Sequence, residues 1–383
     1  ATVKSSLAFS KKEAAMKKRK IMIVFGTRPE AIKMAPLILA LKKNVNFEVI
    51  VTVTAQHRQM LDQVLATFSI SPDFDLDIMK DQQTLSEITS NVIQQLDCVL
   101  KSVKPELILV HGDTTTTLAA SLAAFYNQVK IGHVEAGLRT YDKYSPFPEE
   151  MNRQLTDSLS DIYFAPTKES RQNLLNEAHD ESAIHITGNT AIDALKYTIT
   201  DTYEHPVLHK IPLEDRFVLL TMHRRENQGS PMEEVFKAIT EVINADIHTH
   251  IIFPVHLNPI VQKSAHELLG NHPRIHLISP LDVFDFHNMA ARSYFIMSDS
   301  GGVQEEAPSL GKPVLVLRET TERPEGVLAG TLKLIGTEKE TVQNAMLDLL
   351  TDRVLYEQMS KASNPYGDGN ASAKIIAALI KMS

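Results

Sequence analysis

Apolar residues in the first half of the chain fall into short continuous runs that alternate with longer runs of helical spacing. A short apolar run predicts a strand buried on both faces, and apolar residues at every third or fourth position predict an amphipathic helix. The predicted strands are Ile21–Phe25, Phe47–Thr54, Leu107–Val110, Ile131–Val134 and Ile162–Ala165. The predicted helices are Glu30–Lys43, Arg58–Phe68, Thr84–Val103, Thr114–Tyr126 and Glu149–Leu159. This alternation indicates a parallel sheet covered by helices on both faces.

The alternation stops between Thr200 and Asp215 and then resumes, which predicts a second domain of the same kind. We place the boundary near Asn189–Asp215, with an N-terminal domain over residues 16–190 and a C-terminal domain over residues 191–365. The strands predicted for the second domain are Phe217–Thr221, Ile251–Val255, Ile275–Ile278, Tyr294–Met297 and Val314–Leu317. The fold class is therefore α/β, with two Rossmann-like doubly wound domains and a ligand site in the crevice between them.

Composition and charge exclude several classes of partner. The 383 residues carry a formal net charge of −8, so the chain has no global basic field for nucleic acid, although a local cationic pocket for phosphate is compatible with that balance. No apolar stretch approaches the roughly 18 residues of a membrane span. The single cysteine, Cys98, lies in a helix-like run, and we expect a small core residue. We expect a cytoplasmic protein with no nucleic-acid and no membrane partner.

The first twenty residues are polar and basic. They lack the apolar segment of a secretory signal. Met16, followed by a basic run and a strand, is typical of a natural start, so we expect residues 1–15 to be an added leader with no role in the fold.

The first predicted strand runs into the segment Gly26–Lys33, of sequence GTRPEAIK. Glycine allows a tight turn, proline suits the first turn of a helix, and a helix N-terminus attracts anions. Arg28 and Lys33 are candidates for charge-assisted bonds to a diphosphate. The segment is neither a G-x-G-x-x-G turn nor a Walker loop, which argues against nicotinamide and against ATP hydrolysis. The alternative is a surface turn with two solvated cations.

Asp113, Glu135 and Glu149 lie at or soon after the carboxyl ends of successive predicted strands. A carboxylate at the end of a buried strand is costly unless it is paired, whereas one at a helix start is stabilised by the helix dipole. Helix capping or pairing therefore explains each acid taken alone. Three acids at the strand ends of one sheet are stronger evidence for a catalytic role, because they could converge in one crevice as acid and base partners.

The second half of the chain supplies cations and a glycine-rich turn. His223 and Arg224 follow one predicted strand, and Ser300-Gly301-Gly302 opens a helix after another. Backbone N–H groups of such a turn bind anions. Glu306, one helical turn further on, is placed to accept hydrogen bonds from ribose hydroxyls. The alternative is a glycine-rich turn with a surface glutamate.

The 15 histidines do not form a metal pattern, because the chain has neither an H-E-x-x-H motif nor a cysteine pair. We therefore predict no metal and no cofactor. By default, His256 and His287 are interpreted as ordinary polar residues.

Seven blocks, in order along the chain, resemble the signatures of the bacterial non-hydrolysing UDP-N-acetylglucosamine (UDP-GlcNAc) 2-epimerases. The blocks are Gly26–Lys33, His111–Thr114, His133–Arg139, His223–Asn227, Ser298–Glu306, Thr320–Glu325 and Asn364–Gly369. The resemblance runs from about Lys20 to the C-terminus without large gaps. It implies a B-type glycosyltransferase-like fold with the active site in the interdomain cleft, a homodimer, and a final helix within residues 366–383 that crosses back to the first domain.

The resemblance also implies a reaction, the reversible conversion of UDP-GlcNAc to UDP-N-acetylmannosamine (UDP-ManNAc). The C2 proton is barely acidic, so the family eliminates UDP in anti fashion to give 2-acetamidoglucal and then adds UDP back with the proton on the other face. This chemistry needs a base and an acid on opposite faces and firm capture of the departing diphosphate. Synthesis of cell-surface polysaccharide or of teichoic-acid linkage units would use the product.

The site residues that the resemblance implies fall into three groups. The catalytic positions are Asp113, Glu135, Glu149 and His223. The UDP-binding positions are Arg28, Lys33, Leu281, Phe286, Ser300, Gly301, Gly302, Glu306 and Arg323. A second, allosteric UDP-GlcNAc site of some bacterial members matches Gln56, Gln59, Glu149, Arg224 and His256. Gln82 departs from the family pattern, because allosteric relatives carry an arginine there, and the loss of that cation weakens a phosphate contact.

Three other functions remain open from the residues alone. A true glycosyltransferase shares the fold and the UDP site, and a hydrolysing epimerase releases free ManNAc and UDP. A nucleotide-sugar-binding regulator would have no turnover at all. The three acids argue against the regulator, because a protein that only binds an anion gains nothing from carboxylates.

Overall fold

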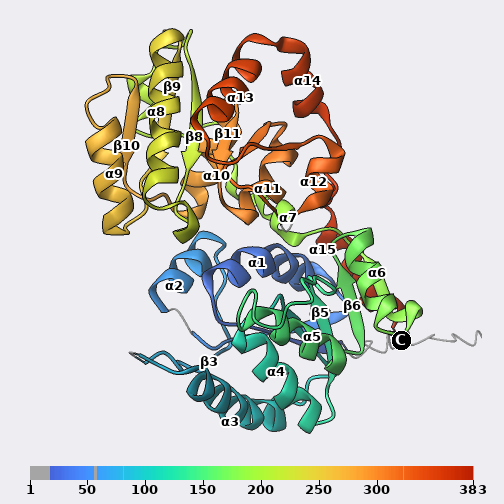
Figure 1. Cartoon of the computed structure of the whole chain (residues 1–383). Helices are drawn as coiled ribbons and strands as arrows, with labels where there is room; N and C mark the ends of the chain where they lie inside the picture. Colours follow the sequence, from blue (N-terminus) through green and yellow to red (C-terminus); the bar gives the residue numbers. More distant parts are fainter. Residues whose placement is uncertain (1–17, 56–57, 81, 322, 383) are drawn as a thin grey trace, which may run out of the picture.

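The computed structural model describes residues 18–55, 58–80, 82–321 and 323–382, with residues 58–60 by their backbone alone (Figure 1). The leader predicted for residues 1–15 lies outside the described residues. Among the described residues, no helix is both long and apolar enough to cross a membrane.

A parallel seven-stranded sheet organises residues 19–186, with the strand order β3-β2-β1-β4-β5-β6-β7. Its strands are β1 (Arg19–Phe25), β2 (Phe47–Val53), β3 (Phe74–Asp75), β4 (Leu107–His111), β5 (Lys130–Val134), β6 (Ile162–Ala165) and β7 (Ile184–Ile186). The chain leaves β1 in one direction along the sheet and returns to β4 on its other side. The carboxyl ends of β1 and β4 therefore form a topological switch point, where open α/β sheets bind ligands.

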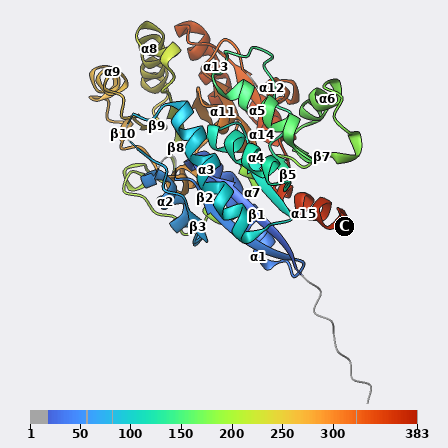
Figure 2. The same ribbon diagram turned by 90° about the horizontal axis from the view of Figure 1, so that it is seen from below.

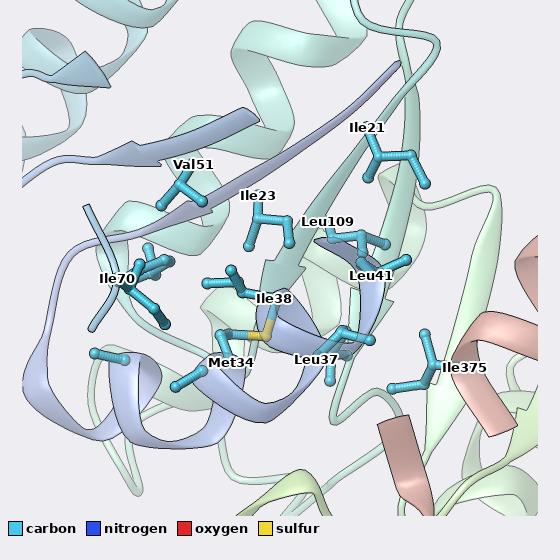
Figure 3. Close-up of a cluster of buried hydrophobic side chains, with 14 of the residues drawn as sticks. Ile21, Ile23, Met34, Leu37, Ile38, Leu41, Val51, Ile70, Leu109 and Ile375 are labelled. Carbon is cyan, nitrogen blue, oxygen red and sulfur yellow. The ribbon is translucent and has the colours of Figure 1, made fainter. Parts of the chain in front are cut away.

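Helices cover both faces of this sheet, because successive residues of each strand point to opposite sides and consecutive residues are apolar and buried. The helices are α1 (Arg28–Lys43), α2 (Arg58–Thr67), α3 (Leu85–Val103), α4 (Thr115–Tyr126), α5 (Glu149–Leu159), α6 (Lys168–Asn176) and α7 (Thr190–Thr198), with the 3₁₀ turn η1 (Glu181–Ala183). Ile21 and Ile23 of β1 pack in one cluster with residues of α1 (Figure 3). Met22 and Val24 pack on the other face with α3 and α4.

The C-terminal domain repeats the architecture with a parallel six-stranded sheet in the order β10-β9-β8-β11-β12-β13. Its strands are β8 (Arg216–Thr221), β9 (Thr249–Pro254), β10 (Ile275–Ile278), β11 (Ile296–Ser298), β12 (Val314–Val316) and β13 (Leu332–Leu334). Its helices are α8 (Ser230–Ala245), α9 (Pro259–Leu269), α10 (Val283–Arg292), α11 (Gly301–Glu306), α12 (Pro324–Ala329), α13 (Lys339–Thr351) and α14 (Arg353–Lys361). The 3₁₀ turns are η2 (Leu208–Lys210), η3 (Arg225–Asn227) and η4 (Ala307–Leu310). The switch point of this sheet lies between β8 and β11.

The last helix, α15 (Ala371–Lys381), lies beside α1 and α7 and away from α14 (Figures 1 and 2). Ile375 and Leu379 are fully buried in the cluster that contains Leu37 of α1 (Figure 3). Asp193 of α7 accepts hydrogen bonds from the backbone N–H groups of Ala371 and Ser372, at 3.1 and 2.9 Å. The C-terminus is thus fastened to the first sheet by an apolar face and by a carboxylate at its helix start.

The predicted fold class is confirmed, since both domains are doubly wound parallel sheets. The strand predictions missed β3, β7 and β13, which are only two or three residues long and are edge strands of the two sheets. The prediction that Cys98 is a core residue is wrong, because this side chain is exposed. The buried stripe of α3 runs through Ile88, Val92, Leu96 and Leu100, and Cys98 is two residues from that stripe, on the other side of the helix.

Candidate active site between the two domains

Four of the sequence blocks lie at the two switch points, directly after β1, β4, β8 and β11. Two adjoining cavities open between the domains at this place, and Lys33 and Arg323 line both of them. One cation thus comes from each domain, and both stand at the junction of the two cavities.

The lining of the larger cavity, of about 1200 Å³, includes eight of the nine residues that the resemblance assigns to UDP. These residues are Arg28, Lys33, Leu281, Phe286, Ser300, Gly302, Glu306 and Arg323. His223 lines the same cavity, whereas Gly301 is buried at the first position of α11 and does not line it. The lining combines an apolar end at Leu281 and Phe286 with a cationic end, as a nucleoside diphosphate requires.

The smaller cavity, of about 620 Å³, is lined by polar and charged side chains. Asp113 and Glu135 reach it from the N-terminal domain, and Arg224 and Glu305 reach it from the C-terminal domain. Two of the three predicted acids therefore share one chamber.

Glu135 follows β5 in a left-handed backbone conformation, with φ at 66°. Such a conformation is strained for a residue with a side chain, and strain of this kind clusters at functional sites. Its Oε2 atom lies 2.5 Å from Nζ of Lys33 and 3.6 Å from Nε2 of His111, and it accepts a 3.0 Å hydrogen bond from Nδ2 of Asn189. Burial opposes the charge of this carboxyl, but Lys33 and His111 outweigh it and hold the pKa of Glu135 well below its usual range.

Asp113 follows β4, and its Oδ2 atom lies 3.3 Å from Nη1 of Arg153. The amide of Asn152 holds the Asp113 backbone carbonyl at 2.9 Å. Burial raises the pKa of Asp113; Arg153 opposes this rise, and the negative charge of Glu135 adds to it. The two carboxyls in the chamber therefore have pKa values pushed in opposite directions, the usual arrangement of an acid and base pair.

Glu149 is the first residue of α5, as predicted, but it lines neither cavity. Its Oε2 atom is buried and has no hydrogen-bond partner among the described residues. Its charge nevertheless acts on Asp113 and raises the pKa of that carboxyl further. The charge of Glu149 thus acts on Asp113 although its side chain is absent from the lining of both cavities.

His223 and Arg224 are positioned by Asp299, a fully buried residue in the loop after β11. Oδ2 of Asp299 accepts hydrogen bonds from the backbone N–H groups of His223 and Arg224, both at 2.9 Å, and from the amide of Asn227 at 3.0 Å. The ring of His256 stacks on the ring of His223, with centroids 5.5 Å apart. Asp299 therefore fixes the backbone of His223, a predicted catalytic residue, whose ring contacts His256, a predicted allosteric residue.

Comparisons with known proteins match this geometry. A family model described as UDP-N-acetylglucosamine 2-epimerase matches residues 39–380. The chain belongs to this family. The UDP-N-acetylglucosamine 2-epimerase of Bacillus subtilis is 62% identical over 365 residues, which cover 95% of this chain and 96% of the relative. The resemblance stated from the sequence blocks is thereby confirmed, and with it the enzyme class, an isomerase.

Solved structures of family members agree in fold. UDP-GlcNAc 2-epimerase from Neisseria meningitidis, bound to UDP-GlcNAc, is 49% identical with a TM-score of 0.84, and the match covers 94% of this chain and 100% of that one. The enzyme from Methanocaldococcus jannaschii, in complex with UDP-GlcNAc and UDP, is 34% identical with a TM-score of 0.76, covering 94% and 99%. The kitacinnamycin glycosyltransferase is only 13% identical, with a TM-score of 0.63 over 96% and 99% of the chains, and it shows the shared glycosyltransferase-like fold alone.

Several residues of the site were not found from the sequence, among them Asn189, Glu305 and His287. Asn189 was interpreted only as a domain boundary, and Glu305 only as part of a block. His287 was interpreted as an ordinary polar residue, yet its two ring nitrogens lie 2.7 Å from Oγ1 of Thr198 and 3.2 Å from Oε2 of Glu306. The adjacency of Glu305 to Glu306 was the one available signal.

Two predicted allosteric positions are not placed. Gln56 lies outside the described residues, and so does the side chain of Gln59. Gln82, the departure from the family pattern, adopts a left-handed backbone conformation with φ at 57°.

Glu30 joins the loops of the first switch point and is only 2% exposed. Its Oε2 atom accepts hydrogen bonds from the N–H groups of Gly26 and Thr27, at 3.0 and 2.8 Å, and from the Thr27 hydroxyl at 2.8 Å. Its Oε1 atom accepts from the hydroxyls of Thr114 and Thr117, at 2.7 and 3.1 Å. One carboxylate thus fixes the turn before α1 to the helix start after Asp113.

We expect Glu30→Gln to lower the free energy of unfolding by about 3 kcal/mol, because a buried amide nitrogen cannot accept the bonds that one carboxylate oxygen accepts. Urea denaturation measures this loss. Glu87→Gln is the matched control, since Glu87 accepts the same bonds from Thr84 at the start of α3 but on the exposed surface. Equal losses in both variants would contradict the role given to Glu30.

Proposed function

We propose that the chain interconverts UDP-GlcNAc and UDP-ManNAc by anti elimination of UDP and re-addition through 2-acetamidoglucal, without hydrolysis. The observation that carries this proposal is the meeting of the two cavities at Lys33 and Arg323. A diphosphate held between these cations puts the nucleoside into the larger cavity and the sugar into the chamber of Asp113 and Glu135. The relatives crystallised with UDP-GlcNAc support the choice of ligand.

The larger cavity suits the nucleoside in detail. Leu281 and Phe286 form an apolar lining for the uracil ring. Glu306 lies where it can accept hydrogen bonds from the ribose hydroxyls, and His287 contacts its Oε2 atom at 3.2 Å. Gly301 and Gly302 open α11 after its N-cap Ser300, and because the first N–H groups of a helix have no intrahelical partner, they are candidate donors to the diphosphate.

In the chamber, we assign Glu135 as the base that takes the C2 proton of UDP-GlcNAc and Asp113 as the acid that delivers a proton to the opposite face. The assignment follows the two pKa directions, since Glu135 is held ionised and Asp113 favours its protonated form. The roles exchange in the reverse reaction. Glu149 supports the protonated state of Asp113 by its charge.

Lys33, Arg323 and His223 serve the departing diphosphate. Their positive or donor groups compensate the charge that develops on the leaving oxygen, and they retain UDP until it adds back. Retention matters here because UDP is both leaving group and nucleophile.

One experiment separates this proposal from its competitors: incubation with UDP-GlcNAc in heavy water, followed by NMR. The proposal requires UDP-ManNAc with deuterium at C2 and no net release of UDP. A glycosyltransferase would need an acceptor and would introduce no deuterium at C2. A hydrolysing epimerase would release free ManNAc and UDP, and a regulator would leave the sugar unchanged. Any of the last three results rejects the proposal.

We further propose that UDP-GlcNAc activates the enzyme from a second site that includes Arg224 and His256. Two contacts support this proposal: Arg224 lines the chamber, and His256 stacks on His223. The complex of a relative with both UDP-GlcNAc and UDP is compatible with two nucleotide positions. Gln59, Gln56 and Glu149 complete the set that the family resemblance implies.

We expect pure UDP-ManNAc to turn over slowly until a trace of UDP-GlcNAc is added, because the activator orders the loop of His223. Initial rates with and without the trace measure the effect. His256→Ala should reduce the activation at least about tenfold, since the loss of the stacked ring uncouples the two sites. Fast turnover of pure UDP-ManNAc by the unchanged protein would reject the activation.

The family resemblance also favours a homodimer, which light scattering on the purified protein tests. The product suits pathways that transfer ManNAc to cell-surface polysaccharide or to teichoic-acid linkage units.

A further inference from the structure

Asn189 lies at the junction of the two domains, where the chain leaves β7 and begins α7. It is 4% exposed. Its backbone N–H donates to the carbonyl of Tyr366 at 2.7 Å, and its Oδ1 atom accepts from the N–H of Ala191 at 2.9 Å, which caps α7. The backbone and Oδ1 are therefore fixed, and the orientation of the Nδ2 group follows from them.

The Nδ2 group of Asn189 donates to a carboxylate of each domain. One hydrogen bond of 3.0 Å reaches Oε2 of Glu135, and another of 2.6 Å reaches Oε2 of Glu305 in α11. The other oxygen of Glu305 accepts from Nε of Arg323 at 2.8 Å. A continuous chain of contacts thus runs from Lys33 through Glu135, Asn189 and Glu305 to Arg323.

This chain joins the two cations at the cavity junction through buried groups. Glu305 is 4% exposed, and its backbone carbonyl accepts from the amide of Asn364 at 2.8 Å, so α11 is also fixed at this point. A primary amide is the neutral group that can donate one proton to each of two carboxylates while its oxygen caps a helix. A hydroxyl has one proton, and an ionised carboxylate has none.

We propose that Asn189 is a positioning residue for the reaction: its two amide protons hold Glu135 and Glu305 together across the domain boundary and fix the Glu135 carboxylate toward C2. This inference rests on the proposed function, in which Glu135 exchanges the C2 proton. Asn189 itself does not touch the reacting atoms.

The groups around Glu135 determine how a change at Asn189 alters the pH dependence. Lys33 of α1 and His111 at the end of β4 favour the ionised form of Glu135. Burial raises the pKa values of the neighbouring acids, Asp113 after β4 and Glu305 of α11, and the negative charge of Glu135 raises both further. Arg323 acts mainly on Glu305. Removing the amide donor, or replacing it with a third acid, therefore makes it easier to protonate this cluster.

Two variants test the proposal in the whole protein. Asn189→Ser keeps a side chain that caps α7 but is too short to reach both carboxylates, and Asn189→Asp keeps the shape but introduces an acid. We expect kcat for C2 exchange to fall about 100-fold in both, with KM changed less than threefold, because the misplaced base slows proton transfer. In Asn189→Asp, the acidic limb of the kcat–pH profile should also move up by about one pH unit.

Asn288→Asp is the matched control. Asn288 is fully buried and also lies at the domain junction, where it donates to the carbonyls of Thr198 and Phe284 rather than to carboxylates. A purely structural role of Asn189 predicts equal effects in Asn288→Asp and Asn189→Asp, with no shift of the acidic limb, and that result would overturn the proposal. So would an unchanged kcat in Asn189→Ser.

The unchanged protein is measured first, in heavy water with UDP-GlcNAc. If it shows no exchange at C2, the proposed function fails. If it exchanges and both Asn189 variants match it in rate and in pH profile, only the role of Asn189 fails. Thermal unfolding with and without UDP identifies a variant that is merely unfolded, and Asn189→Ser then decides the question, because its capping residue preserves α7.

Discussion

Glu135→Gln should lower kcat at least about 1000-fold while UDP binds within about threefold of its normal affinity. Glutamine has the same shape but cannot take a proton from C2. Glu135 also has a strained backbone, a partly buried cation at 2.5 Å and a pKa held well below its usual range. The loss should therefore appear in kcat, with little change in UDP affinity measured by calorimetry.

Glu234→Gln is the control, since Glu234 also pairs with a lysine, Lys237, and neither residue lines either cavity. We expect its activity to stay close to that of the unchanged protein. Activity of Glu135→Gln within tenfold of normal would show that another group removes the proton.

Asp113→Asn separates the two acids. With UDP-GlcNAc in heavy water, this variant keeps the base Glu135 but lacks the acid on the opposite face. It should therefore introduce deuterium at C2 of UDP-GlcNAc while forming little UDP-ManNAc, and Glu135→Gln should do neither. The opposite pattern would exchange the roles of the two carboxyls.

The pH dependence of activity follows from the opposite pKa shifts of Glu135 and Asp113. As the pH falls through the lowered pKa of Glu135, the base is protonated and activity is lost, so the acidic limb should lie below the usual range of a glutamate. As the pH rises through the raised pKa of Asp113, the acid is lost, so the alkaline limb should lie above the usual range of an aspartate. Epimerisation of UDP-GlcNAc should be fastest between these limits.

The placement of the acids at strand ends could be predicted because it depends on local pattern alone. An apolar strand followed by a carboxylate indicates where Asp113 and Glu135 lie, and the parallel order of the sheet brings their strand ends to one edge. The sequence could not show that Glu149 acts on Asp113 without lining either cavity. The position of Glu149 depends on how α5 packs against α4, which no single segment determines.

The contacts across the domain boundary could not be predicted, because they depend on the relative position of the two sheets. Glu305 and Glu306 are neighbours in one helical turn, and only the packing of α11 turns Glu305 toward Asn189 and Glu306 toward His287. The stack of His256 on His223 joins loops after β9 and β8 in the same way. Short range patterns identify candidate groups, whereas long-range packing decides which of them meet.

Lys33→Met should lower kcat/KM for UDP-GlcNAc about 1000-fold, because Lys33 both captures the diphosphate and keeps the base Glu135 ionised. Its ammonium stands at the junction of the two cavities, where it meets the diphosphate, and it also pairs with Glu135 at 2.5 Å. Removing one partner of a buried ion pair leaves the other charge uncompensated. Both the capture of UDP and the ionisation of the base are therefore weakened by one substitution.

The two effects of Lys33→Met have separate readouts. Weaker capture should appear as a loss of UDP affinity in calorimetry and as release of UDP and 2-acetamidoglucal during turnover, since the leaving group escapes before it adds back. Without the ammonium, burial is less opposed and the pKa of Glu135 rises, so the acidic limb of the kcat–pH profile moves to higher pH. Lys42→Met, on the exposed side of the same helix, is the control and should show neither effect. Suppose that Lys33→Met lost UDP affinity while the acidic limb of its kcat–pH profile stayed in place. Lys33 would then bind the phosphate only, and its proposed effect on the ionisation of Glu135 would be wrong.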